Sequence, residues 1–213
     1  MGYLYENRTD AGKQLAKQMI SYQGRDVVVL AIPRGGLPIG AEVARILKAP
    51  LDVALSKKIG HPYNREYALG AVSLESMVIS DTETIPKAYI EEETARIRET
   101  LRKRQDQYYK NRKPVPLRDK LVIVVDDGIA TGNTLMATVQ LVAKQSPAKI
   151  IVGIPVAPRQ AVRMLDALPE VDKVICLATP SDFRAVGQFY LHFYQVSDEE
   201  AIRILDEVNS AIL

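Results

Sequence analysis

The sequence has little of several residue types on which common classes of protein depend. It contains one cysteine, Cys176, which excludes an intrachain disulfide framework and a cysteine-rich metal site. Only two histidines are present, His61 and His192, and neither has a catalytic or metal-binding partner at a recognisable spacing. The first residues show no apolar signal region, and no apolar run is long enough to span a bilayer. We therefore expect a cytoplasmic protein without a membrane partner.

The chain also lacks a strong net charge. Its formal charge is +2 over 213 residues, and 47% of the residues are hydrophobic, which suffices for one sizeable core. Residues 96–120 hold ten basic and three acidic side chains, but pairs four residues apart, such as Glu99 and Lys103, neutralise part of that face. A nucleic-acid partner is therefore not expected. The narrow apolar stripe of this segment allows a homodimer contact or packing on the parent domain.

Alternation of apolar strands with helices predicts a three-layer, doubly wound α/β fold with a mostly parallel sheet. The predicted strands are 27–31, 51–55, one within 69–80, 121–125, 149–154 and 173–177. The predicted helices are 9–22, 38–47, 86–111, one from 133 or 134 to 144, 158–168 and 197–212. Residues 61–81 break the alternation, because two short apolar runs around Glu75 and Ser76 indicate a hairpin or an antiparallel edge strand.

Two of the predicted strands end in loops that could carry chemistry. The first is followed by Pro33-Arg34-Gly35-Gly36, and the fourth by DDGIATGNT at 126–134. The second loop leads into a helix, whose free N–H groups and positive dipole end form an anion site. Ligands of such sheets bind where the strand order reverses, so the two loops would face each other if their strands are neighbours. Neither a P-loop nor a dinucleotide-binding glycine pattern is present.

The segment VIVVDDGIATGNT resembles the fingerprint of type I phosphoribosyltransferases, a hydrophobic strand followed by DD-x-x-x-TG-x-T. IPRGGLPIGAEVA, SKKIG and DEEA are similar to a group of uncharacterised bacterial and archaeal members. The resemblance implies one domain over 1–213, with an insertion at 60–118 and a C-terminal hood or tail at 179–213. It also implies a six-stranded sheet whose third strand is antiparallel. The implied substrate is 5-phosphoribosyl-1-pyrophosphate (PRPP) with Mg²⁺, and the second substrate is an acceptor base.

The same resemblance assigns roles to individual residues. Asp126 and Asp127 would hold the ribose hydroxyls. The 5′-phosphate would be wrapped by Gly128, Ile129, Ala130, Thr131, Gly132, Asn133 and Thr134. The pyrophosphate would meet Arg34, Gly35, Gly36, Lys57 and Lys58, with Arg34 and Lys58 contributing to catalysis beside the two aspartates. Adjacent carboxylates at a strand end point in opposite directions, so Mg²⁺ should be held mainly by substrate oxygens and water.

One position departs from part of this family. Phosphoribosyltransferases for 6-oxopurines carry an aspartate two residues before the glycine of the loop, where this sequence has Ala130. A hypoxanthine or guanine acceptor is therefore not favoured, and the acceptor stays unnamed.

Three functions remain open from the sequence. The preferred one is phosphoribosyl transfer from PRPP to a nitrogenous acceptor with release of pyrophosphate. The second is a non-catalytic module that senses PRPP or a nucleotide, and the third is a hydrolase or lyase of a phosphoribosyl compound. Lys57 and Lys58 could equally be a solvated pair. The aromatic residues after the last strand could be core residues or part of a hood over the acceptor: Phe183, Phe189, Tyr190, Phe193 and Tyr194.

Overall fold

The structure is a computed structural model that describes residues 2–79, 85–110 and 112–211. Within strand β4, the side chains of 65–67 are also not described. The ends predicted for one strand at Ser80 and for two helices at Asn111 and Ile212 lie outside these residues. No helix among the described residues is long and apolar enough to cross a membrane.

The central sheet has five parallel strands in the order β2-β1-β6-β7-β8. The strands are β1 (Val27–Ala31), β2 (Leu51–Val53), β6 (Leu121–Val125), β7 (Lys149–Val156) and β8 (Lys173–Ala178). Every residue of β1 and of β6 is buried. The continuous apolar runs of the sequence are thus the inner strands of a sheet covered on both faces.

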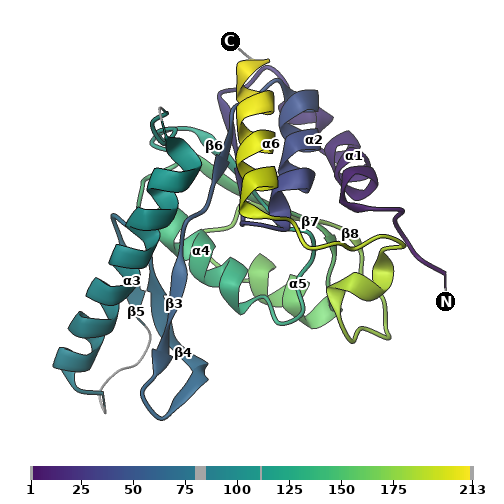
Figure 1. The fold of residues 1–213 in the computed structure, drawn as a ribbon. Coiled ribbons are helices and arrows are strands. Elements are labelled where there is room, and N and C mark those ends of the chain that lie inside the picture. Colours follow the sequence, from purple (N-terminus) through teal and green to yellow (C-terminus); the bar gives the residue numbers. More distant parts are fainter. Residues whose placement is uncertain (1, 80–84, 111, 212–213) are drawn as a thin grey trace.

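Helices form a layer on each face of this sheet (Figure 1). One layer consists of α1 (Arg8–Gln18), α2 (Gly36–Leu47) and α6 (Asp198–Ser210), and the other of α4 (Asn133–Ala143) and α5 (Arg159–Asp166). Alternate residues of β1 divide between the layers: Val29 packs in the cluster that holds α1, α2 and α6, and Val28 in the cluster that holds α4 and α5. The predicted doubly wound, mostly parallel fold class is confirmed.

A second, antiparallel sheet stands apart from the central one. Its strands are β3 (Lys57–His61), β4 (Asn64–Val72) and β5 (Met77–Ile79), in the order β3-β4-β5. The prediction that a strand within 69–80 joins the central sheet as its third strand is wrong, since the central sheet has five strands among the described residues. The reason is packing, because Ile59, Leu69 and Val72 bury their side chains against a helix of this same excursion. The predicted hairpin is confirmed as β4 and β5.

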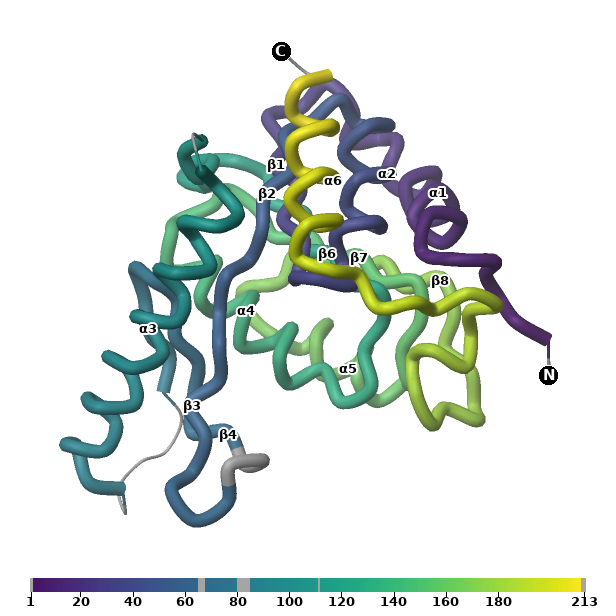
Figure 2. Tube along the Cα trace, viewed as in Figure 1, coloured from purple at the N-terminus to yellow at the C-terminus, as the bar shows by residue number. Residues whose placement is uncertain are grey.

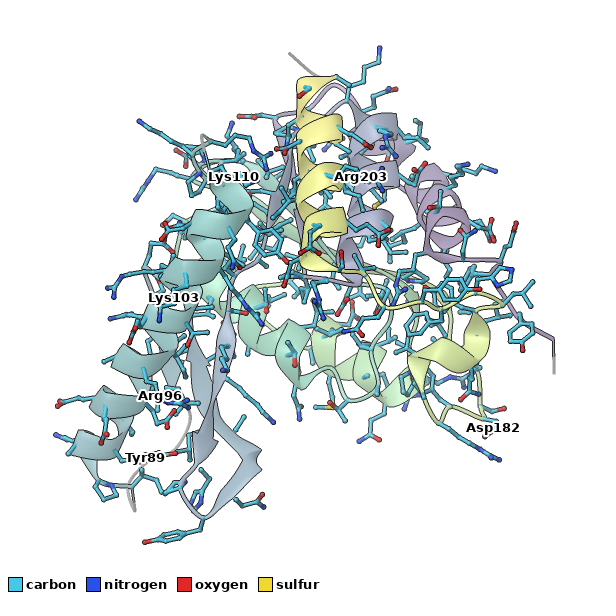
Figure 3. The ribbon with its side chains drawn as sticks, in the orientation of Figure 1. Tyr89, Arg96, Lys103, Lys110, Asp182 and Arg203 are labelled. Carbon is cyan, nitrogen blue, oxygen red and sulfur yellow. The ribbon has the colours of Figure 1, made fainter. Side chains whose placement is uncertain are left out.

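That helix is α3 (Lys87–Tyr109), which runs beside the second sheet (Figure 1). Its apolar stripe, Ile90, Ile97 and Leu101, is covered by the small sheet. Figure 3 shows basic side chains spaced along the helix, and the side chain of Lys103 is 74% exposed. The apolar stripe therefore packs on the chain itself, and the basic residues form a solvated face.

The N-terminal residues pair with the segment that follows β8. We call residues 4–7 the N-terminal strap and residues 179–196 the hood segment, which contains the short 3₁₀ helix η2 (Val186–Phe189). The N–H of Tyr5 donates to the carbonyl of Phe189 at 3.0 Å, and the N–H of Leu191 donates to the carbonyl of Tyr5 at 2.9 Å. Figures 1 and 2 show the two segments side by side at one end of the sheet. A second 3₁₀ turn, η1 (Ile20–Tyr22), follows α1.

Candidate active site

The two loops singled out in the sequence meet at the carboxyl edge of the central sheet. Strands β1 and β6 are neighbours in register, with Ala31 opposite Val125. A Cβ atom added to Gly35 would lie 2.2 Å from Oδ2 of Asp127. The backbone of Gly35 has an ordinary helical φ of −61°, so glycine is needed there for close approach. The expectation that the loops face each other is confirmed.

The loop after β6 ends in an open helix N-terminus. Gly132 adopts a φ of 80°, which favours glycine, and α4 begins at the next residue without a side-chain cap. Thr131, Asn133 and Thr134 are exposed. Ile129 is buried, and its N–H donates to the carbonyl of Val156 at 3.1 Å, which anchors the loop to β7. Free N–H groups, exposed hydroxyls and the helix dipole together form a site suited to a phosphate.

The two aspartates before this loop have different surroundings. Oδ1 of Asp126 accepts a hydrogen bond from the N–H of Asp127 at 2.8 Å. Burial raises the pKa of Asp126 well above its ordinary value, and the neighbouring charge of Asp127 raises it further. Burial also raises the pKa of Asp127, but Arg8 opposes that rise. Burial therefore disfavours the charged form of both carboxyl groups, and Arg8 opposes this most directly at Asp127, to which it is hydrogen-bonded.

Arg8, the first residue of α1, is a site residue that the sequence did not reveal. Its Nε donates to Oδ2 of Asp127 at 2.8 Å, and its Nη1 donates to the carbonyl of Tyr194 at 2.6 Å. The guanidinium carbon lies 3.8 Å from the centroid of the Phe193 ring. Arg8 precedes the motif by more than a hundred residues and belongs to no pattern of its own, so no signal in the sequence pointed to it.

The hood segment also touches the loop. The hydroxyl of Tyr190 donates to the carbonyl of Asp127 at 2.5 Å, and burial raises the pKa of that hydroxyl. Phe189 and Tyr190 are buried, whereas Tyr194 is 75% exposed. The aromatic cluster thus supplies both core residues and residues at the surface.

Arg34 lies on the loop after β1 but points to a different partner. Its Nη1 is 3.6 Å from Oδ2 of Asp198, the first residue of α6. The other carboxylate oxygen of Asp198 accepts from the hydroxyl of Tyr108 at 2.9 Å. The peptide bond between Pro33 and Arg34 is cis. Asp198 and Tyr108 had not been predicted to belong near the site.

Comparison with known proteins assigns the family. Residues 3–192 match the model of the phosphoribosyl transferase domain. The chain belongs to this family. Its structure superposes on TT1426 from Thermus thermophilus with a TM-score of 0.87 at 39% identity, covering 95% of this chain and 98% of that one.

One curated relative and one solved structure extend the comparison of this phosphoribosyl transferase domain. A Mycobacterium tuberculosis protein that bears phosphoribosyl transferase as a provisional name is 36% identical over 211 residues, which is 97% of this chain and 47% of the relative. The chain thus spans about half the length of the curated relatives it matches. A Neisseria gonorrhoeae protein, solved with bound ppGpp, shares the fold at a TM-score of 0.52 and 16% identity, covering 96% and 94% of the two chains.

The predicted site residues of this family member are brought together in part. Gly35, Gly36, the aspartate pair and the loop from Gly128 to Thr134 meet at one edge of the sheet. Lys57 and Lys58 instead open β3 in the second sheet, where both are exposed. The described residues contain no group of three His, Cys, Asp or Glu side chains that could hold a metal ion.

Proposed function

We propose that this domain transfers a phosphoribosyl group from PRPP to a nitrogenous acceptor and releases pyrophosphate. The observation that carries the proposal is the meeting of three parts at one sheet edge. These are the glycine loop after β1, the aspartate pair after β6 and the open N-terminus of α4. A phosphorylated sugar with a pyrophosphate group offers one chemical group to each part.

Each part has a role in this proposal. The N-terminus of α4, with Thr131 and Thr134, binds the 5′-phosphate. The ribose hydroxyls bind Asp126 and Asp127. Arg8 binds Oδ2 of Asp127, and Oδ1 accepts no hydrogen bond from another described residue, so it is available to a hydroxyl of the ligand.

In this proposal the loop after β1 binds the leaving group, pyrophosphate. The backbone of Gly35 and Gly36 approaches the pyrophosphate, and Arg34 leaves Asp198 to meet it. Lys57 and Lys58 would add positive charge after a movement of the second sheet. Displacement at the anomeric carbon builds positive charge on the sugar and negative charge on the pyrophosphate, so positioning and electrostatics supply most of the catalysis.

Mg²⁺ belongs to the same proposal and enters with PRPP. The donor set fits this arrangement, because burial disfavours the charged form of Asp126 by raising its pKa and Oδ2 of Asp127 is engaged by Arg8, which leaves few protein ligands for a cation. When bound, the ion neutralises charge on the pyrophosphate. The chain's own residues hold the sugar and its 5′-phosphate.

The proposed acceptor is a nitrogenous base whose reaction does not depend on an aspartate at position 130. Ala130 is exposed and cannot exchange a proton with a base. The hood segment, with Phe193 and Tyr194 at its surface, is the proposed cover of the acceptor subsite.

The direct test is a thermal-shift titration with Mg²⁺ and PRPP, followed by a pyrophosphate-release assay with candidate bases. A ligand that binds only the folded state raises stability by about 2.7 kcal/mol at a concentration one hundred times its Kd. Absence of any PRPP-dependent shift would overturn the proposal.

A second candidate is a module that binds PRPP or a nucleotide without turnover. It is favoured by one observation, namely that Arg8 and Arg34 are both engaged by the chain's own carboxylates. The same assay separates the functions. Binding of PRPP without pyrophosphate release for any acceptor supports the module, and release without an acceptor supports a hydrolase.

A further inference from the structure

Arg8, the first residue of α1, is a charged residue whose side chain is largely removed from water. Its side chain is 12% exposed, and that of its partner Asp127 is 14% exposed. A pair this far removed from water loses much of its hydration, so it persists only where geometry and further hydrogen bonds compensate. Both conditions are met, because the Nε–Oδ2 distance is 2.8 Å and Nη1 has its own acceptor on Tyr194.

The contacts of Arg8 join three segments that are distant in sequence. It belongs to α1, its ion pair reaches the loop after β6, and its remaining contacts reach the hood segment through the carbonyl of Tyr194 and the ring of Phe193. The N-terminal strap that precedes it is itself hydrogen-bonded to the hood segment. Arg8 is therefore held both by the hood segment and by the N-terminal strap, in addition to its ion pair with Asp127.

This arrangement uses only one oxygen of Asp127. Oδ2 is bound by Arg8, and the same atom faces Gly35, where no side chain intervenes. Oδ1 accepts no hydrogen bond from another described residue. A carboxylate fixed through one oxygen has a defined orientation, and its second oxygen is directed for a ligand.

We propose that Arg8 is a positioning residue of the ribose subsite, holding Asp127 so that its free oxygen receives a ribose hydroxyl. The inference rests on the proposed function and adds to it a residue outside the motif. Arg8 touches Asp127 and the hood segment, and it acts on the sugar through Asp127.

The electrostatics of the site agree with this role. Among the described residues, the ionisable groups that face Asp127 are Asp126 on its own loop, Arg8 on α1 and Tyr190 on the hood segment, and the loop after β1 brings the backbone of Gly35 close to the carboxylate. Burial and the second carboxyl disfavour charge at the pair, and Arg8 is the cation that opposes them. Without Arg8, the charged form of Asp127 would be less favoured. Asp127 would then accept the hydrogen bond of a ribose hydroxyl less strongly.

The test compares two ligands that share the pyrophosphate group but differ in the sugar. Calorimetric titrations with Mg²⁺·PRPP and with Mg²⁺·pyrophosphate are made on the wild type, Arg8→Met, Arg8→Lys and Arg203→Met. Arg203 is a control of the same type, since it is exposed on α6, where it pairs with Glu207.

We expect Arg8→Met to weaken PRPP binding by about tenfold to a hundredfold, the range for losing a charged hydrogen bond. Its binding of pyrophosphate should change by about twofold or less, as should both affinities of Arg203→Met. Arg8→Lys keeps the charge but not the planar fork, so it should recover part of the PRPP affinity. Arg8→Lys also keeps the inference testable if Arg8→Met does not fold.

The outcomes separate the inference from the function on which it rests. PRPP binding by the wild type together with equal binding by both Arg8 variants would overturn the role of Arg8 alone. Equal weakening of PRPP and pyrophosphate would also overturn it, since that result indicates a general structural effect. Failure of the wild type to bind PRPP would overturn the proposed function and the ribose role with it.

Discussion

The two loops of the candidate site are held by ion pairs of very different exposure. On the proposed ribose side, Arg8 and Asp127 are 12% and 14% exposed and 2.8 Å apart. On the proposed pyrophosphate side, Arg34 and Asp198 are 36% and 47% exposed and 3.6 Å apart. The first pair fixes its carboxylate, whereas the second is a weak contact that water can replace. If the proposed function holds, the ribose subsite is preformed, and Arg34 is a cation that is free to move onto its ligand.

The largest effect is expected from Gly35→Ala, which forces the two loops apart. The new Cβ would lie 2.2 Å from Oδ2 of Asp127, the atom that Arg8 holds, so either the ion pair or the loop must shift. We expect PRPP binding to weaken by about a hundredfold, because a charged hydrogen bond is worth about 1.5–3 kcal/mol. Titration calorimetry measures this, with Gly2→Ala as the control, since a Cβ at Gly2 meets nothing within 4 Å. Unchanged affinity would show that Asp127 need not be fixed.

The next effect concerns stability and is expected from Asp127→Asn. The variant leaves Arg8 as a buried cation without a carboxylate, although relief of repulsion with Asp126 offsets part of the cost. We expect the free energy of unfolding to fall by about 2 kcal/mol. Urea denaturation measures it, and the double variant with Arg8→Met should cost less than the sum of the single changes. Additive costs would contradict the coupling between the two residues.

Much of this site was predictable because its parts are continuous in sequence. The apolar run from Leu121 to Val125 predicts a buried strand, and the residues after it predict the turn and the helix start. The pairing of the two loops followed from one further condition, that their strands are neighbours, which the register of β1 and β6 meets.

The remaining parts depend on contacts that no local pattern encodes. Arg8 reaches Asp127 across 119 positions, and only the folded chain brings the N-terminal strap against the hood segment. The hairpin was predictable from its two short apolar runs, but the sheet that it joins was not, because that choice depends on the apolar face of α3. The sequence of β3 is polar, so no strand was predicted there. In the structure this strand places Lys57 and Lys58 outside the central sheet.

A pH-dependent effect is expected at Asp126. Its raised pKa means that the folded state binds a proton more tightly than the unfolded state does. The wild type therefore loses stability as the pH rises from about 4, the ordinary value for aspartate, through the raised pKa. Asp126→Asn has no such proton, so its stability relative to the wild type should increase with pH. Urea denaturation between about pH 4 and pH 8 checks this, and a difference that is independent of pH would contradict it.

The smallest effect is expected from Asp198→Asn, which removes the charge facing Arg34. Because both side chains of this pair are at least a third exposed, the free energy of unfolding should fall by about 0.5 kcal/mol or less. The amide can still accept the hydrogen bond from Tyr108, so the contact between α3 and α6 is kept. Release of Arg34 should leave pyrophosphate binding equal or slightly tighter, which calorimetry measures. A loss of stability as large as that of Asp127→Asn would show that the pyrophosphate side is fixed as firmly as the ribose side.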